Sequence, residues 1–478
     1  MFTNRFPRLE PLSDEAIAVL DGGWKRLVSE IGIQFDHPEA LARFRAAGQQ
    51  VEDTIVKLDP EFVLEQIAKA PAEFTLHARN PARSVAIGGD AMVFVPVQGP
   101  PFVRRGDERR EATLADLDDF CRLAQSLDDL DTAGGLPCEP NDRPLDSRHL
   151  DIVRSLVTLT DKPFQGSQIS GVAAADSLAL GRIVFGDALD RQACMYTNVN
   201  VNSPLRYDER MLEALLAYAE AGQAVIVTPF LLMGAMAPVS IPAALAQQTA
   251  EALAGIALVQ LVRPGCPVVL GSFLSNTDMK SGSPGFGGPE SAFGLLASGQ
   301  LARHYRLPWR SGGGALTTSP VPDAQAAFEG TNTMMSAFLA GANVVMHTAG
   351  WLEGGLVASF EKVVVDLDIV RTLCAEFTPI EIDAESLAFE AHDEVRHGGH
   401  FLGAAHTMTR FRDCFYRPLL STTENFQRWT RNGSQDAATR ATAIVAELLA
   451  AYEPPPFDAA IAAELDEHVA RRRRELGD

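Results

Sequence analysis

The chain has 478 residues, of which 46% are hydrophobic and 22% charged, a composition typical of a globular protein with a large core and not of a disordered chain. Its net charge of −21 would repel phosphate backbones, which excludes nucleic acid as the expected partner. Six cysteines without CxxC spacing, no signal-peptide pattern and no uncharged apolar run of roughly 18 residues predict a reduced, cytoplasmic protein without a membrane span.

Residues 1–91 are predicted to form a helical cap with a β-hairpin. Apolar residues recur at intervals of three and four in 14–30, 38–47 and 59–70, which indicates amphipathic helices. Residues 73–91 alternate apolar and polar side chains around the turn at Asn80-Pro81, which is typical of a hairpin.

Residues 92–376 repeat one pattern, in which a short β-branched run meets Gly, Pro, Ser or Asn and a helical segment follows. The predicted strands are 92–98, 131–136, 163–168, 193–200, 224–229, 267–273, 308–313 and 343–347. The predicted helices are 114–127, 146–159, 172–186, 208–221, 241–263, 289–305, 322–340 and 358–376. Eight such units predict a (β/α)8 TIM barrel of α/β class. The alternative is an open doubly wound sheet, but no GxGxxG opens any turn.

Residues 377–478 break this pattern and are predicted to form a C-terminal extension packed on the barrel. Helical periodicity returns in 436–452 and 458–476, and the last helix carries four arginines at 471–474, which are typical of a solvated helix end. Four histidines lie between 392 and 406. They lack the HxxxH spacing of a helical zinc site and have no cysteine pair beside them, so no metal site is predicted.

A barrel of this kind carries its site at the carboxyl ends of its strands, and those ends are polar here. The predicted substrate-binding residues are Gln98, Gln168, Tyr196, Asn198, Asn200, Phe230, Phe273, Ser311, His347, Trp351 and Glu353. Asn202 belongs to an Asn-Ser-Pro stretch that favours a turn. Amides and hydroxyls outnumber titratable groups, which suits orienting a substrate more than acid-base chemistry.

The last unit, residues 343–366, is the most distinctive stretch. An apolar run ends in His347, and a glycine-rich loop then carries Trp351 and Glu353. His347 and Glu353 are the candidate catalytic residues. Lys362 and Glu361 lie in the first turn of the following helix, where a carboxylate is favourable without any catalytic role.

The stretches RNPARSVAIGG (79–89), HTAGWLEGGLVASFEK (347–362) and GGHFLGAAHT (398–407), in this order around the barrel units, resemble the trimethylamine methyltransferase family in its branch without pyrrolysine. The resemblance implies a barrel that presents a methylated amine to the Co(I) of a separate corrinoid (cobalamin) protein. It also implies that no cofactor is bound tightly by this chain, and that quaternary amines such as glycine betaine are the substrates.

The residues are compatible with this implication. A quaternary ammonium is held by aromatic rings, and Phe94, Tyr196, Phe230, Phe273, Trp309 and Trp351 lie at or near strand ends, with Glu353 as the expected counter-charge. The carboxylate of a betaine would need His347, Arg310 or loop amides. A homo-oligomer is expected. Two alternatives remain: a non-catalytic amine- or betaine-binding barrel, and a metal-dependent barrel lyase that uses His392 to His406.

Overall fold

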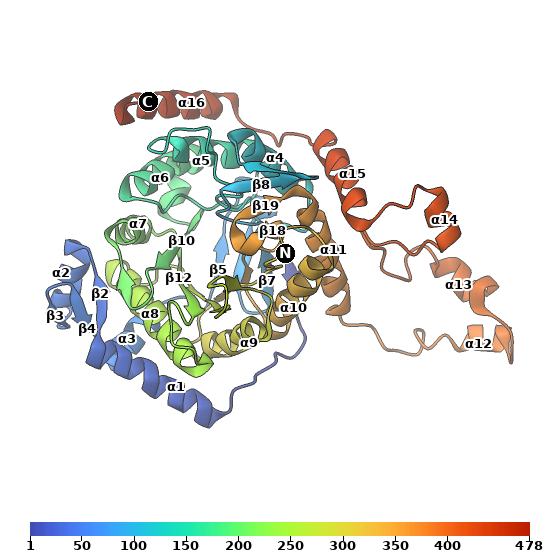
Figure 1. Cartoon of the computed structure of the whole chain (residues 1–478), viewed down its shortest axis with the longest axis horizontal. Helices are drawn as coiled ribbons and strands as arrows, with labels where there is room; N and C mark the ends of the chain where they lie inside the picture. Colours follow the sequence, from blue (N-terminus) through green and yellow to red (C-terminus); the bar gives the residue numbers. More distant parts are fainter.

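The structure, a computed structural model, describes all residues from 1 to 478. A curled parallel sheet lies at its centre, and helices surround it (Figure 1). Six strands form the continuous part of this sheet, in the order β7 (Ala91–Phe94), β17 (Val344–Val345), β16 (Trp309–Ser311), β13 (Val268–Gly271), β12 (Ala224–Met233) and β10 (Tyr196–Val201). Each neighbouring pair is parallel, so all six carboxyl ends lie at the same side.

Two shorter segments continue the sheet beyond β10. Residues 163–168 join it by a parallel bridge between Gln165 and Tyr196, and residues 131–136 join 163–168 by a second parallel bridge at Gly134. A backbone hydrogen bond of 2.9 Å links 131–136 to β7. The sequence predicts full strands at both places. The structure has single bridges because Gly134 adopts a φ of +73°, which ends the extended conformation.

Eight helices alternate with these strands along the chain. They are α4 (Leu114–Ser126), α5 (Arg148–Leu159), α6 (Gly171–Phe185), α7 (Glu209–Glu220), α8 (Ile241–Val262), α9 (Pro289–His304), α10 (Ala324–Ala340) and α11 (Phe360–Glu376). All eight predicted helices are confirmed to within two residues at either end. Their starts follow from local chemistry: Thr113 and Asp116 form a capping box at α4, and Asp208, Asp323 and Ser359 cap α7, α10 and α11.

Helix α8 is the one helix long and apolar enough to cross a membrane. Of its most apolar window, 89% is buried inside the protein, where α8 packs against α1 (Asp14–Arg26), α3 (Pro60–Ile67) and β12. Its composition is therefore that of a core helix covered on all sides by its own chain.

The N-terminal residues form three helices and a small sheet. The helices are α1, α2 (Pro38–Ala46) and α3, and the sheet contains β2 (Ile33–Phe35), β3 (Gln50–Glu52), β4 (Ile55–Lys57) and β11 (Arg206–Tyr207). Strand β1 (Phe2–Thr3) pairs antiparallel with β7. The periodicity of the sequence indicates the helices, whereas three-residue strands are too short to leave an alternating signal.

The antiparallel hairpin of β5 (Glu73–Leu76) and β6 (Val85–Gly88) lies at the amino ends of the central strands. Leu76 and Ile87 pack there against Val93, Ile226 and Val344 in one buried apolar cluster. Because these side chains fill the interior, the hairpin closes this end of the sheet.

Further short strands follow the carboxyl ends. Strands β8 (Phe102–Arg105), β9 (Glu108–Glu111), β18 (Trp351–Leu352) and β19 (Val357–Ser359) form one sheet, and β14 (Phe273–Thr277) pairs with β12 and β15 (Pro284–Gly285). These elements stand above the ends of β7, β12, β13 and β17.

The C-terminal residues do not all pack on the body. Helix α15 (Ala437–Ala450) packs against α11 and α4, and α16 (Ala459–Leu476) packs against α5 and α6. Helices α12 (Phe389–Val395), α13 (Ala405–Arg410) and α14 (Phe426–Arg431) instead project to the side (Figure 1). In α16, Arg472 and Arg473 form ion pairs with Asp176 and Asp151. Two of the four terminal arginines therefore fasten the helix to the body, where the sequence predicts a solvated end.

Candidate active site

Arg310, in the middle of β16, is a buried cation without a counter-charge. Its side chain is almost inaccessible, Nη1 donates to the Ser272 carbonyl at 3.1 Å, and Nε has no hydrogen-bond partner. Burial lowers the pKa of Arg310 to about 9, so the guanidinium remains charged at neutral pH. A buried charge without a partner is costly, and an anionic ligand would supply that partner.

His347 faces Arg310 from the end of β17. Its Nδ1 accepts a hydrogen bond from the Gln98 backbone N–H at 3.3 Å, which assigns the ring proton to Nε2. Burial and the neighbouring Arg310 hold the pKa of His347 well below its usual range, so the ring is neutral. Nε2 lies 3.4 Å from Nη2 of Arg310. Two donors thus face each other with no acceptor between them, and one carboxylate oxygen could accept from both.

The backbone of His347 is strained. Its φ is +57°, in the left-handed region that costs a residue with a side chain roughly 1 to 2 kcal/mol. Gly314 makes this possible from the neighbouring loop, because a Cβ there would lie 2.3 Å from the His347 carbonyl oxygen. Strain of this kind gathers at sites that bind ligands or react.

Aromatic rings cluster beside this pair of donors. The His347 and Trp351 ring centroids are 4.4 Å apart, Phe230 and Phe273 are 4.6 Å apart, and Phe286 lies 5.5 Å from Phe273 and 5.7 Å from Trp351. The rings come from β12, from the start of β14, from the segment that follows β17 and from the loop after β15. Such a cluster binds a quaternary ammonium through the negative faces of its rings.

Other buried polar atoms of the same region lack partners. They are Gln98 Oε1, Gln165 Oε1, Tyr196 Oη and Trp351 Nε1. Each unmade bond costs roughly 1 to 3 kcal/mol, and such atoms are rare in folded proteins. Gln98 follows β7, Gln165 lies in the bridging segment 163–168 and Trp351 lies in β18. Tyr196 is instead the first residue of β10 and packs in the apolar cluster at the amino ends of the strands. Gln98, Gln165 and Trp351 therefore indicate a place where a ligand or solvent completes the hydrogen bonding.

Three more predicted site residues, and Asn202, have partners of their own. Asn198 accepts from Thr228 at 2.7 Å and donates to the exposed Asn200 at 2.9 Å, so both line a polar side of the interior. Gln168 accepts from Gln165 and lines a neighbouring small pocket. Asn202 forms a turn with Asp208, the role that its sequence favours.

Glu353 does not face the aromatic cluster as a free carboxylate. It adopts a φ of +49° and forms a two-pronged ion pair with Arg109 of β9, at 2.9 Å. Its charge is therefore already matched, and the expectation that Glu353 neutralises a bound cation does not agree with this geometry. The sequence shows no sign of this partner, because Arg109 lies in a charged run about 240 positions earlier.

Replacing Glu353 with glutamine should therefore change the KM for substrate by less than about fivefold, because only a partly exposed ion pair is lost. Steady-state kinetics would measure this. An Arg109→Gln variant is the matched control and should behave like Glu353→Gln. A much larger effect of the Glu353 substitution alone would show that the carboxylate contacts the substrate.

Three further residues named from the sequence point away from the interior of the sheet. Ser311 follows Arg310 on β16, so it points to the opposite face and donates to the Gly313 carbonyl of its own loop. Trp309 points the same way as Ser311, with its Nε1 on Ser272. Phe94 stacks on Phe338 of α10 outside the sheet. None of the three lines the interior.

Sequence reasoning missed Phe286 and gave Arg310 only a conditional role. Phe286 lies in a glycine-rich segment between β15 and α9, and its burial there is a long-range effect of the rings around it. The sequence does contain an indication that Arg310 is a site residue. It is an arginine inside a short predicted strand, where an unpaired charge is rarely found.

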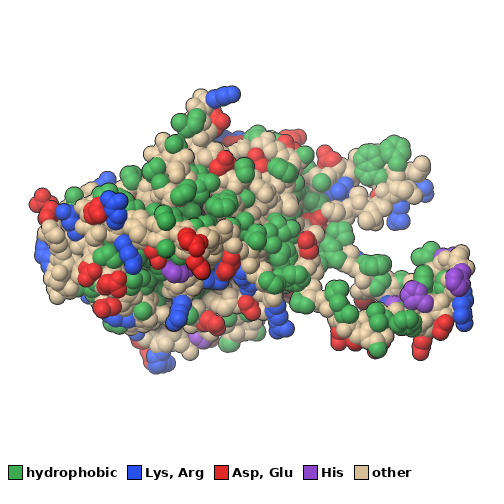
Figure 2. Space-filling model, turned by 90° about the horizontal axis from the view of Figure 1, so that it is seen from below, with side chains coloured by type: hydrophobic (Ala, Val, Ile, Leu, Met, Phe, Trp, Pro, Cys, Tyr) green, Lys and Arg blue, Asp and Glu red, His purple; other side chains and the backbone are tan.

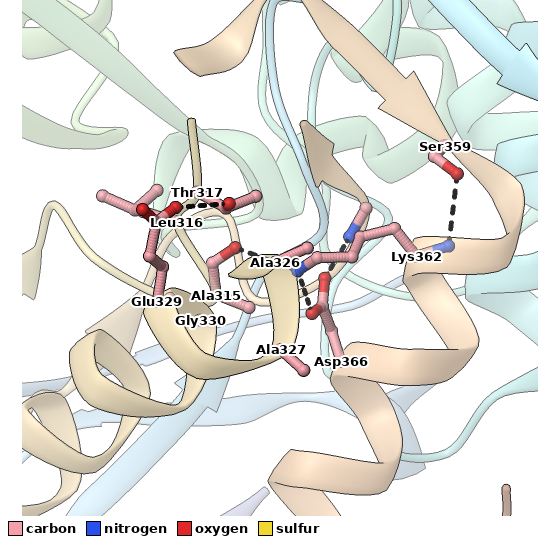
Figure 3. Close-up of polar contacts among 12 residues, drawn as sticks. Ala315, Leu316, Thr317, Ala326, Ala327, Glu329, Gly330, Ser359, Lys362 and Asp366 are labelled. Atoms are coloured by element: carbon pink, nitrogen blue, oxygen red, sulfur yellow. Dashed lines mark hydrogen bonds and ion pairs between the residues drawn. The ribbon is translucent and has the colours of Figure 1, made fainter. Parts of the chain in front are cut away.

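A buried ion pair supports the loops of the site from below. Lys362 Nζ contacts Asp366 Oδ1 within α11, and both side chains are fully buried. Lys362 also donates to the Ala315 carbonyl at 3.3 Å (Figure 3). The Gly350 N–H donates to Asp366 at 2.8 Å. Burial raises the pKa of Asp366 to about 6, although the Lys362 charge opposes this shift. The pair thus ties the loop after β16 to the loop that carries Trp351.

The fold and the site define the class: an α/β protein with a buried cation and a ring cluster at the carboxyl ends of a parallel sheet. Residues 1–477 match the family described as trimethylamine methyltransferase (MTTB). The chain belongs to this family of methyltransferases.

The chain is 41% identical to the glycine betaine methyltransferase of Desulfitobacterium hafniense (strain Y51), over 99% of each chain. It is 30% identical to the proline betaine:corrinoid methyltransferase of Eubacterium limosum, over 84% of each. Among solved structures, it is similar to the Methanosarcina barkeri monomethylamine methyltransferase (MtmB), with a TM-score of 0.53, 10% identity, and 94% of this chain and 90% of that chain covered. This last likeness shows the mixed α/β fold alone.

Proposed function

We propose that this protein transfers a methyl group from a betaine, a quaternary ammonium that carries a carboxylate, to the Co(I) of a separate corrinoid protein. The observation that carries the proposal is the buried, unpaired guanidinium of Arg310 next to a cluster of aromatic rings. Such a site matches both charges of a zwitterion. The two betaine methyltransferases to which the chain is similar support the same substrate class.

The geometry orients the substrate. Arg310 pairs with Gly271 of β13, whereas Phe273 lies two positions further along the chain and pairs with Phe230. Trp351 lies beyond β17, in β18. The carboxylate would therefore bind deep, on Arg310 and on the Nε2–H of His347. The ammonium would lie nearer the open end, with its methyl groups toward the partner protein.

The reaction needs little from the chain beyond this placement. The electron pair of Co(I) forms the new Co–C bond, the C–N bond breaks, and its electrons stay on nitrogen, so a neutral tertiary amine leaves without a proton. No general base is required, and neutral His347 is suited to hydrogen bonding. The contribution of the site is orientation and exclusion of water.

We also propose that the sheet is a complete (β/α)8 barrel over residues 92–376, with 1–91 as a cap and 377–478 as an extension. The eight helices, the two parallel bridges and the hydrogen bond back to β7 support closure. We infer a cytoplasmic protein that binds no cofactor tightly, because the corrinoid belongs to its partner.

A substrate panel tests the function. The protein, a corrinoid protein reduced to Co(I) and glycine betaine should give methyl-Co(III) in the visible spectrum. Choline is the matched control, because it keeps the trimethylammonium and lacks the carboxylate. We expect choline to react at least about 100-fold more slowly, since Arg310 would stay unpaired.

Equal rates with choline would contradict the role of Arg310. If betaines raise the melting temperature but no corrinoid partner is ever methylated, the protein is the non-catalytic binding barrel. The lyase alternative is not supported, because His392 to His406 lie on the projecting helices α12 and α13 and on the segment between them, away from the strand ends (Figure 1).

A further inference from the structure

Two buried amide oxygens beside the proposed betaine site have no hydrogen-bond partner. Gln165 is 2% exposed, and its Nε2 donates to Gln168 Oε1 at 3.0 Å, but its own Oε1 accepts from nothing. Gln98 Oε1 is buried and unpaired in the same way. Buried amide oxygens without a donor are unfavourable and rare in folded proteins. Both atoms therefore indicate that a group from outside the chain donates to them.

Gln165 faces the same interior as Arg310. Gln165 bridges to Tyr196, and Arg310 pairs with Val344. Residues that pair across parallel strands point to the same face of a sheet, and Tyr196 and Val344 belong to one buried cluster inside the sheet. A cavity of about 40 Å³ lies beside the side chains of Gln165 and Gln168. It has room for a water-sized group and not for a whole betaine.

The polar side chains of this interior are mostly neutral. Charged side chains are spread over the outer surface of the body (Figure 2). Inside the sheet, Asn198 pairs with Ile226 of the interior cluster, and Asn200 follows it on the same face. Gln98 lies on the opposite side, where its backbone N–H donates to His347 Nδ1 at 3.3 Å. Amide groups on both sides of the interior fit an uncharged polar group of the ligand.

Glycine betaine cannot donate to these amides. Its carboxylate only accepts hydrogen bonds, and its nitrogen is fully methylated and has no N–H. Arg310 and His347 suit the carboxylate, because both present donors, so Gln98 and Gln165 remain without one. A hydroxyl group would supply the donor. It also accepts hydrogen bonds, so it fits an amide side chain in either orientation.

We propose that the preferred substrate is a hydroxylated betaine, whose hydroxyl donates to Gln165 Oε1 while its carboxylate binds Arg310, with Gln98 as a second contact. This inference rests on the betaine site proposed above. The hydroxyl takes no part in the bonds that form or break. Its hydrogen bond fixes the carbon skeleton and thus the direction of the C–N bond. Glycine betaine is then a poorer substrate, because water must occupy the place of the hydroxyl.

Matched pairs of ligands test this inference. Carnitine and 4-(trimethylammonio)butanoate differ by one hydroxyl, as do 4-hydroxyproline betaine and proline betaine. In isothermal titration calorimetry of the full chain, the hydroxylated member of at least one pair should bind about tenfold more tightly or better. Equal or weaker binding of the hydroxylated member in both pairs would overturn the inference and would show that the amides hold only water.

A variant assigns the preference to its residue. Gln165→Leu should bring the affinity ratio of that pair to within about twofold of one. The matched control is Gln248→Leu between α8 and α9, outside the sheet. Gln248 is also 2% exposed, its Oε1 is unpaired, and its Nε2 donates to Ser298 at 2.9 Å. This control should keep the ratio of the wild type, and a Gln165→Leu protein that keeps it as well would contradict the assignment.

Methyl transfer separates this inference from the proposed function. If glycine betaine methylates the corrinoid protein and neither pair shows a preference, the function stands and the inference fails. If the hydroxylated ligands bind with the expected preference and no betaine methylates a corrinoid protein, the binding inference stands and the proposed transfer fails.

Discussion

Replacing Arg310 with methionine should lower kcat/KM for glycine betaine about 100- to 1000-fold, which corresponds to roughly 3 to 4 kcal/mol for losing one partner of a buried charge pair. The loss should appear mainly in KM, because the carboxylate is bound equally before and during methyl transfer. Steady-state formation of methyl-Co(III) at several betaine concentrations would measure both constants.

Ser311→Ala is the matched control for this experiment. It alters the next residue on the same strand, which points away from the interior, and should leave kcat/KM within about twofold. Arg310→Lys keeps the charge but loses the planar fork, and its kcat/KM should fall between those of the other two variants.

The unliganded Arg310→Met variant should melt no lower than the wild type, because it removes an uncompensated buried cation. Unchanged betaine kinetics in this variant would contradict the proposed orientation.

Replacing Lys362 with methionine should destabilise the fold by about 3 to 5 kcal/mol, because Asp366 would remain buried without its cation. Urea denaturation would show this as a lower midpoint with little change in slope. The double variant Lys362→Met/Asp366→Leu should recover most of the loss, since both charges are then gone.

Arg26 and Glu30 supply the control for this pair. They form an ion pair at the same spacing of four residues, but both side chains are largely exposed, so Arg26→Met should hardly move the midpoint. If Lys362→Met behaves like Arg26→Met, the buried pair is not what holds the two loops. The single Lys362 variant should also raise KM for betaine, because the Gly350 loop that carries Trp351 depends on Asp366.

Much of the fold follows from sequence periodicity. The eight helices of the central region lie where apolar spacing and capping residues place them, and six of the eight predicted strands form continuous ladders. The segment 131–136 does not, because Gly134 and Gly135 offer the ladder no side chains. Pairing between neighbouring strands is a long-range property, and apolar runs alone do not determine its extent.

The site could be predicted only in part. Position at a strand end correctly brings His347, Trp351, Phe230 and Phe273 together. Position at a strand end does not show which residue of the strand faces inward. Apolar and polar side chains do not alternate in Trp-Arg-Ser in a way that would predict Arg310 rather than Ser311 as the inward residue. The partner of Glu353 comes from the β8–β9 hairpin, whose charged sequence gives no strand signal.

The hairpin of β5 and β6 has a consequence for the order of events. Because Leu76 and Ile87 close the amino end of the sheet, we expect the amine to reach Arg310 from the carboxyl ends of the strands. In the proposed reaction the corrinoid protein must approach from the same side, at the carboxyl ends of the strands. The betaine would therefore bind first, and the corrinoid protein would cover the site during methyl transfer. The demethylated amine would be released only after the corrinoid protein has dissociated. This sequence predicts an ordered kinetic mechanism, in which the corrinoid protein binds last and dissociates first.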